Sequence, residues 1–152
     1  MIIRKVAEDD RPQWLALWAA YNAFYGREGP TALAPEITDA TWHRFFDPAE
    51  PVHALVAEVD ERVVGFAHFL FHRSTIFLSP VCYLQDLFTS EEARGRGVAT
   101  ALIEGASGVA SAAGSKRIYW QTHETNSRAR MLYDRLADRS GFIIYRKALE
   151  PR

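Results

Sequence analysis

The sequence predicts one α/β domain, of the α+β kind, in which a mixed and mostly antiparallel sheet of six to seven strands is flanked by about four helices. Short runs of β-branched and aromatic residues alternate along the chain with stretches of helical periodicity. Between residues 81 and 122 a strand, a helix and a second strand follow one another, as in a central βαβ unit. The chain has 152 residues, of which 48% are hydrophobic, so residues 1–152 fit a single domain with one core.

The first fifty residues are expected to hold one strand and two helices. Residues 2–6 suit a short strand, after which Asp9 or Asp10 can cap a helix. Glycines and prolines predict a loop over residues 26–35. A shorter helix with three aromatic residues is expected to begin near residue 38.

The remaining elements are predicted from their flanking turns. Residues 53–58 and 62–72 form a hairpin in this interpretation, and a third strand covers residues 81–89. After the helix that follows residues 94–97, residues 116–122 are expected to form a strand parallel to the third one. We expect a further helix from about Asn126, and a last strand from Gly141 to close the sheet.

Composition excludes several classes of partner. A formal net charge of −1 argues against a nucleic-acid-binding face, which needs an excess of basic residues. No run approaches the length of a membrane span, and the N-terminus has no apolar signal core, so we expect a cytoplasmic protein without a membrane partner. The single cysteine, Cys82, is interpreted as a small buried hydrophobe rather than a nucleophile.

Residues 94–97 read Arg-Gly-Arg-Gly, and they connect a predicted strand to a predicted helix. The first turn of a helix offers unpaired N–H groups and a partial positive charge, and glycine lacks the Cβ that would hold a phosphate away from the backbone. Arg94 and Arg96 add charge and forked donors. This stretch therefore predicts an anion site.

Two common phosphate loops do not fit this stretch. A nucleoside-triphosphate loop needs Lys-Ser or Lys-Thr after its last glycine, whereas Gly97 is followed by Val98. A dinucleotide loop needs a third glycine where Thr100 stands, and an acidic residue at the end of the next strand, which reads Trp-Gln-Thr-His instead.

The remaining interpretation is a resemblance to the GCN5-related N-acetyltransferase (GNAT) family. Residues 94–99 (RGRGVA) match the family's coenzyme A pyrophosphate loop, which is Gln or Arg, any two residues, Gly, any residue, then Gly or Ala. Residues 126–133 (NSRARMLY), followed by Gly141 and Phe142, resemble its N-x-x-A-x-x-L-Y motif with a later G-F. The resemblance implies a GNAT fold, acetyl-CoA as cosubstrate, and no metal.

The resemblance also implies which residues hold the donor. The loop backbone binds the pyrophosphate, the main chain of residues 87–89 pairs with the pantetheine arm like an added strand, and Asn126 contacts that arm or serves as a helix N-cap. Tyr133 is implied as the acid that protonates the departing sulfur; by spacing alone it would be a buried aromatic residue. The implied donor-binding residues are Leu87, Phe88, Thr89, Arg94, Gly95, Arg96, Gly97, Val98, Ala99, Thr100 and Asn126.

Asp86 is the candidate base. It is a charged residue in an apolar strand, where alternation places it on one face with Leu84 and Phe88. Such a placement is costly unless the carboxylate is used or paired, and a salt bridge with a buried arginine is the alternative. The run Tyr-Leu-Gln-Asp-Leu-Phe also resembles that of the spermidine/spermine acetyltransferases, in which Gln85 is replaced by a glutamate usually credited as the base.

The acceptor side is predicted less sharply. Gln85, Tyr25 and His123 are candidates for contacting the substrate, although Tyr25 can equally be core and His123 an exposed loop residue. His68 and His72 stand four apart on a strand, which separates them by roughly 13 Å and argues against a metal site.

The expected function is direct transfer of acetyl from acetyl-CoA to the primary amine of a small molecule, a polyamine-like amine or an amino acid. The long connection from Tyr133 to Gly141 resembles a subgroup of yeast acetyltransferases linked to histones, polyamines and D-amino acids. The alternatives are acetylation of a protein lysine or N-terminus, and a non-catalytic acyl-CoA-binding module. The resemblance also suggests a homodimer.

Overall fold

A computed structural model describes residues 1–150 of the chain. It contains two compact units, Met1–Gln121 and a smaller one that begins at Thr122, and each is described by itself. The first unit holds all five strands and three α-helices, and the second holds the fourth helix.

The first unit is built on one mixed sheet with the strand order β1-β2-β3-β4-β5. The first four strands pair antiparallel, whereas β4 and β5 are parallel and are joined through α3, so the predicted βαβ unit is confirmed. The strands are β1 (Ile2–Lys5), β2 (Val52–Val59), β3 (Arg62–His72), β4 (Val81–Thr89) and β5 (Ile118–Tyr119).

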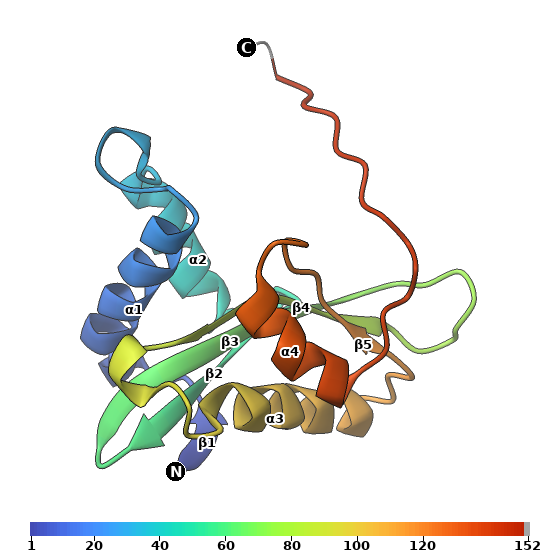
Figure 1. Ribbon diagram of the computed structural model, residues 1–152, viewed down its shortest axis with the longest axis horizontal. Helices are drawn as coiled ribbons and strands as arrows, with labels where there is room; N and C mark the ends of the chain where they lie inside the picture. Colours follow the sequence, from blue (N-terminus) through green and yellow to red (C-terminus); the bar gives the residue numbers. More distant parts are fainter. Residues whose placement is uncertain (151–152) are drawn as a thin grey trace. The chain divides into compact units, whose positions relative to one another are not determined.

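Helices cover both faces of this sheet (Figure 1). Helices α1 (Arg11–Phe24) and α2 (Pro35–Arg44) lie over one face, where a cluster of buried aromatic side chains forms the core. Helix α3 (Val98–Ala112) lies under the other face, where Gly105 approaches Ile3 and Leu55 closely. The sheet is therefore covered by helices on both faces.

The hairpin of β2 and β3 is as predicted. Asp60 and Glu61 both have positive φ angles, 50° and 63°, as the two central residues of a type I′ turn require. Helix α2 begins at Pro35, three residues before the predicted start, because proline at the first helical position needs no N–H partner. Gly114 follows α3 with a φ of 87°, the left-handed conformation in which glycine commonly ends a helix.

The predicted six to seven strands are too many, since the sheet of residues 1–121 has five. The strand expected at residues 116–122 is reduced to Ile118–Tyr119, and residues 137–150, which include the segment from Gly141, form neither helix nor strand. The composition of that segment favours a strand, but a strand also needs a neighbour that pairs with its backbone. Its apolar side chains are exposed, and they include Phe142, Ile143, Ile144 and Tyr145.

Helix α4 (Ser127–Leu136) belongs to the second unit and begins where the sequence predicts. Within residues 1–150, no helix combines the length and the apolar character needed to cross a bilayer.

Candidate functional site

Strand β4 carries an irregularity at Gln85. Its register against β3 shifts there, so that Leu84 stands opposite Phe69 and Asp86 opposite His68, while Gln85 has no partner. Because His68 and Phe69 are consecutive and point to opposite faces, Leu84 and Asp86 also point to opposite faces. The predicted common face for Leu84 and Asp86 is therefore wrong, since one extra residue reverses the alternation.

Asp86 lies at the centre of a buried hydrogen-bond chain. Its Oδ1 accepts a hydrogen bond of 2.8 Å from the Tyr21 hydroxyl, and its Oδ2 lies 2.9 Å from His68 Nδ1. Beyond His68, the indole Nε1 of Trp14 donates to His68 Nε2 at 3.0 Å. The side chain of His68 is 4% exposed and that of Asp86 is 14% exposed, so only the carboxylate has appreciable access to solvent.

This hydrogen-bond chain fixes the tautomer of His68. An indole N–H can only donate, so His68 Nε2 must offer a lone pair and carry no proton. The proton of the neutral ring then resides on Nδ1, which donates to Asp86. His68 thus holds the carboxylate through a neutral donor and supplies no positive charge.

The alternative of a buried arginine beside Asp86 is not what the structure contains. Within residues 1–150 Asp86 forms no ion pair with lysine or arginine, and its two partners, Tyr21 and neutral His68, carry no charge. Burial first, and the neighbouring charge of Asp86 second, raise the pKa of the Tyr21 phenol above its usual value, so that Tyr21 remains a donor. The site therefore presents a carboxylate that lacks a protein counter-ion.

The glycine-rich stretch has the backbone geometry of an open cradle. Gly95 and Gly97 have φ angles of 78° and 79°, a region that residues with a side chain enter only at a cost. A Cβ on either glycine would meet no atom within 4 Å, so the space beside the backbone is open. Gly97 is the N-cap of α3, and the amides of the first helical turn point out of the helix there.

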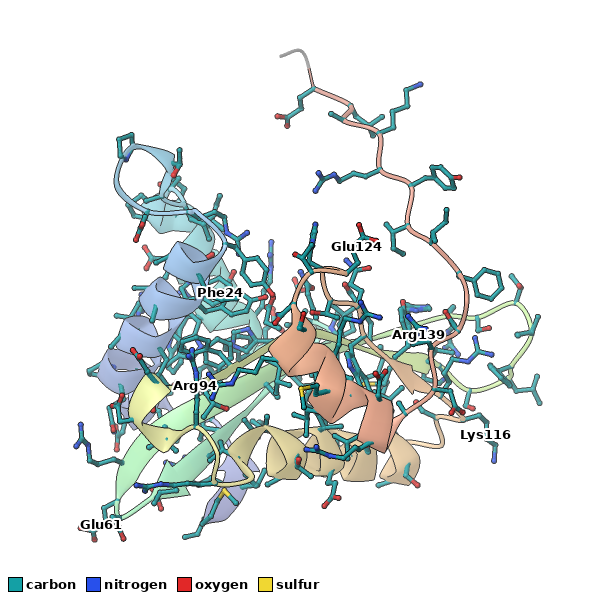
Figure 2. The ribbon with its side chains drawn as sticks, viewed as in Figure 1. Phe24, Glu61, Arg94, Lys116, Glu124 and Arg139 are labelled. Atoms are coloured by element: carbon teal, nitrogen blue, oxygen red, sulfur yellow. The ribbon has the colours of Figure 1, made fainter. Side chains whose placement is uncertain are left out.

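Two arginines stand beside this cradle with their charges uncompensated. Figure 2 shows Arg94 in the connection between β4 and α3. Its guanidinium lies over the Phe88 ring, 6.0 Å from the centroid, and its Nε approaches the Thr89 carbonyl at 3.4 Å. Neither Arg94 nor Arg96 forms an ion pair within residues 1–150, and both are exposed. The loop can thus attract a phosphate anion.

The end of β4 leads into the loop and leaves polar groups unused. The Oγ1 of Thr89 and the Oγ of Ser90 are buried without a hydrogen-bond partner among the described residues. Strand β5 pairs only with Cys82 and Tyr83, so no strand of residues 1–121 covers the outer edge of β4 from there to Thr89. Residues 87–89, including Leu87 and Phe88, therefore lie on a strand edge that an extended ligand arm can join.

Three predicted site residues belong to the second unit. Asn126 is the N-cap of α4, where its Oδ1 accepts from the amide of Ala129 at 3.4 Å, and this leaves its amide group to donate elsewhere. His123 is exposed, and its Nδ1 lies 2.7 Å from the Thr125 hydroxyl. Tyr133 is half-buried on α4.

The predicted acceptor residues of the first unit differ in their surroundings. Tyr25 is 47% exposed and packs edge-on against Tyr21 at 5.1 Å, so it is not a core residue. Gln85 is exposed at the register shift of β4. Sequence reasoning did not single out Tyr21 or His68 as partners of Asp86; the strand register that pairs His68 with Asp86 and the packing of α1 that brings Tyr21 there are the missing signals. Within residues 1–150 no three side chains of His, Cys, Asp or Glu gather as a metal site.

A known protein family and a yeast enzyme match most of this chain. The profile described as the acetyltransferase (GNAT) family matches residues 14–137. The D-amino-acid N-acetyltransferase HPA3 of Saccharomyces cerevisiae is 31% identical over 149 residues, which are 97% of this chain and 90% of the yeast protein.

Solved structures show the same fold. The crystal structure of a probable acetyltransferase superposes with a TM-score of 0.85 at 23% identity, and the match covers 100% of both chains. The aminoglycoside N-acetyltransferase AAC(6′)-Iy, which was solved in complex with CoA, superposes with a TM-score of 0.71 at 20% identity over 97% of this chain and 99% of that one. The mixed sheet with its helices is therefore the GNAT fold.

Proposed function

Because this chain belongs to the acetyltransferase (GNAT) family and is an acyltransferase, we propose that it transfers acetyl from acetyl-CoA directly to the primary amine of a small molecule. The acceptor is a polyamine-like amine or an amino acid. The relative HPA3 is named for acetylating D-amino acids, which supports a small acceptor here. In the reaction, the thioester C–S bond breaks, a C–N bond forms, and the amine's proton is passed on while the sulfur gains one.

One observation carries this proposal: strand β4 holds a carboxylate without a counter-ion and ends three residues later, where the connection to the glycine-rich loop begins. Asp86 faces the aromatic side of the sheet, and Thr89 and Ser90 lead to the glycines. A donor whose arm runs along the β4 edge and whose pyrophosphate occupies the loop would end near Asp86. In this proposal strand β4 positions both acetyl-CoA and the amine that receives the acetyl group.

The donor is held by this chain's backbone in our proposal. The arm adds to the edge at Leu87, Phe88 and Thr89, where backbone amides provide strand-like hydrogen bonds. The pyrophosphate binds the amides of Val98, Ala99 and Thr100. Gly95 and Gly97 keep the approach open, and Arg94 and Arg96 supply charge. The family resemblance adds Asn126, whose side-chain amide group can donate.

Asp86 serves the amine. An alkyl amine with a pKa of roughly 10 is mostly protonated at neutral pH and reacts only after losing a proton. The Asp86 carboxylate attracts the ammonium, orients it through the two fixed hydrogen bonds on its own oxygens, and receives the proton through water. The family resemblance assigns Tyr133 as the donor of the proton that the departing sulfur needs, and we propose Gln85 and His123 as residues that contact the acceptor.

The test is a panel of amines incubated with acetyl-CoA, with release of CoA thiol as the readout. We expect turnover with small primary amines, and a loss of roughly 100-fold or more in kcat for Asp86→Asn. Asp39→Asn is the matched control, because Asp39 is an exposed helical aspartate paired with Arg11.

Other results would replace the proposal. Turnover of peptide lysines or N-termini alone would assign the protein to peptide acetylation, and acetyl-CoA binding without any turnover would make it an acyl-CoA-binding module. A cytoplasmic location and a homodimer are part of the proposal. Native mass spectrometry tests the homodimer.

A further inference from the structure

Arg27 follows α1, which ends three residues earlier at Phe24, and hydrogen bonds hold Arg27 to that helix. Its Nε donates to Asn22 Oδ1 at 2.7 Å, and Asn22 is buried and donates in turn to the Trp18 carbonyl at 2.8 Å. The backbone amide of Arg27 also donates to the Asn22 carbonyl at 2.9 Å. The guanidinium is thus fixed to α1 through a residue that is itself fixed.

The guanidinium of Arg27 lies over two tyrosine rings. Its Cζ is 5.4 Å from the centroid of Tyr25 and 6.0 Å from that of Tyr21. Stacking uses the faces of a guanidinium and leaves its edge, here Nη1 and Nη2, for hydrogen bonding. Within residues 1–150 Arg27 forms no ion pair, and it is half-buried.

Tyr21 contacts both the Arg27 guanidinium and the Asp86 carboxylate. Its ring contacts the Arg27 guanidinium, and its hydroxyl donates to Asp86 Oδ1 at 2.8 Å. An anion without a protein counter-cation and a cation without a protein counter-anion therefore contact one buried side chain, the anion at its hydroxyl and the cation at its ring. A ligand that carries both charges close together matches this pair.

We propose that Arg27 is a specificity-determining residue that binds the carboxylate of an amino-acid acceptor whose amino group is held at Asp86. This inference rests on the proposed function and names its substrate class. Two parallel hydrogen bonds from a guanidinium edge suit a carboxylate. A polyamine would instead bring a second ammonium toward Arg27, and like charges repel. The site thus favours amino acids over polyamines.

The experiment compares each amino acid with the same molecule lacking its carboxylate. The pairs are phenylalanine with 2-phenylethylamine, leucine with 3-methylbutylamine and alanine with ethylamine, with both enantiomers of each amino acid. The variants are Arg27→Gln, which removes the charge, and Arg27→Lys, which keeps the charge without the fork. Arg44→Gln removes an exposed arginine from α2 and is the matched control.

We expect the parent to prefer the amino acid in each pair. Arg27→Gln should lower kcat/KM for the amino acids by about 10- to 100-fold, mainly by raising KM. It should leave kcat/KM for the amines and the KM of acetyl-CoA unchanged. Arg27→Lys should recover part of the loss. The amines serve as the folding control, because a misfolded variant would lose both substrates.

Three results would overturn the inference and leave the proposed function standing: a parent that prefers the amines, equal losses on both members of a pair in a variant with an unchanged KM for acetyl-CoA, and a raised KM for acetyl-CoA that assigns Arg27 to the donor. Absence of turnover with every amine in the parent would instead refute the proposed function itself.

Discussion

His68 and Asp86 stand directly opposite each other on β3 and β4, and His68 Nδ1 lies 2.9 Å from Asp86 Oδ2 across the strand pair. The hydrogen bond from Trp14 reaches the other ring nitrogen, so the two bonds together assign one tautomer. A carboxylate held in this way keeps its orientation whether or not substrate is present.

The tautomer can be measured. Long-range ¹⁵N–¹H correlation spectra of the parent should show a protonated Nδ1 and an unprotonated Nε2 on His68, because the Trp14 indole occupies the lone pair of Nε2. The other four histidines provide the internal reference. A proton found on Nε2 would contradict the hydrogen-bond chain.

Tyr133 is tested by removal of its hydroxyl. Tyr133→Phe should lower kcat by about 10²- to 10⁴-fold with little change in the KM of acetyl-CoA, since a general acid acts on the transition state. Tyr145→Phe is the control, because Tyr145 is 88% exposed and has no assigned role. An unchanged kcat in Tyr133→Phe would remove this residue as the acid.

Gly97 and Gly108 form a matched pair on one helix. Gly97→Ala should lower the free energy of unfolding by about 1–2 kcal/mol, because a side chain is forced to a φ of 79°. It should also weaken CoA binding. Gly108 is exposed inside α3, and Gly108→Ala should raise that free energy by about 0.5–1 kcal/mol with normal kinetics. Denaturant titration and calorimetry of CoA binding distinguish the two variants. Equal effects of both variants on stability and on CoA binding would refute the role of Gly97 in the anion site.

The stability of the first unit should depend on pH through Asp10. Hydrogen bonds from Arg4, with a further one from the Ala7 amide, hold the pKa of the buried Asp10 carboxyl below its usual value. A lowered folded-state pKa contributes stability above the unfolded value, near 4, and this contribution is lost as the pH falls through the folded-state pKa.

The corresponding variant is Asp10→Asn. At pH 7 it should lower the free energy of unfolding by roughly 1–3 kcal/mol, and its difference from the parent should shrink below about pH 4. Asp9→Asn, at an exposed neighbouring position, should stay within about 0.5 kcal/mol of the parent at both pH values. A difference that grows in acid would show that the Arg4 contact is not its source.

Cys82 should be inert in the folded protein. It is fully buried, and burial raises the pKa of its thiol to about 11, so little thiolate exists near neutral pH. Iodoacetamide at pH 8 should leave the native protein unmodified and alkylate it fully in denaturant. Rapid modification of the native protein would contradict the buried position. An inert Cys82 also means that thiol released during turnover is CoA alone.

The sequence predicts the elements of this protein better than their contacts. The bounds of β4 and the turn at Asp60 and Glu61 follow from local composition and turn chemistry, and both are as predicted. The loop at residues 94–97 is placed by its glycines before α3. These features are decided by neighbouring residues, so a single chain suffices to predict them.

The register between strands depends on residues far apart in the sequence, so local patterns do not predict it. The one-residue shift at Gln85 has no local signal, yet it decides which face Asp86 uses and so its pairing with His68. Likewise the segment from Gly141 has strand-forming residues and no strand, because composition does not show what pairs with it. Arg27 acquires its role only from the fold that places it over Tyr21.

The short pairing of β5 has a consequence for the protein's energetics. Because β5 pairs with β4 only at Cys82 and Tyr83, no strand of residues 1–121 pairs with the amides beyond them on that edge. A donor that adds to this edge stabilises the folded chain by mass action, by about 2.7 kcal/mol at one hundred times its Kd. Slower hydrogen exchange at Leu87 to Thr89 would report that gain. The free energy of unfolding of the protein would then rise with the concentration of acetyl-CoA in the cell.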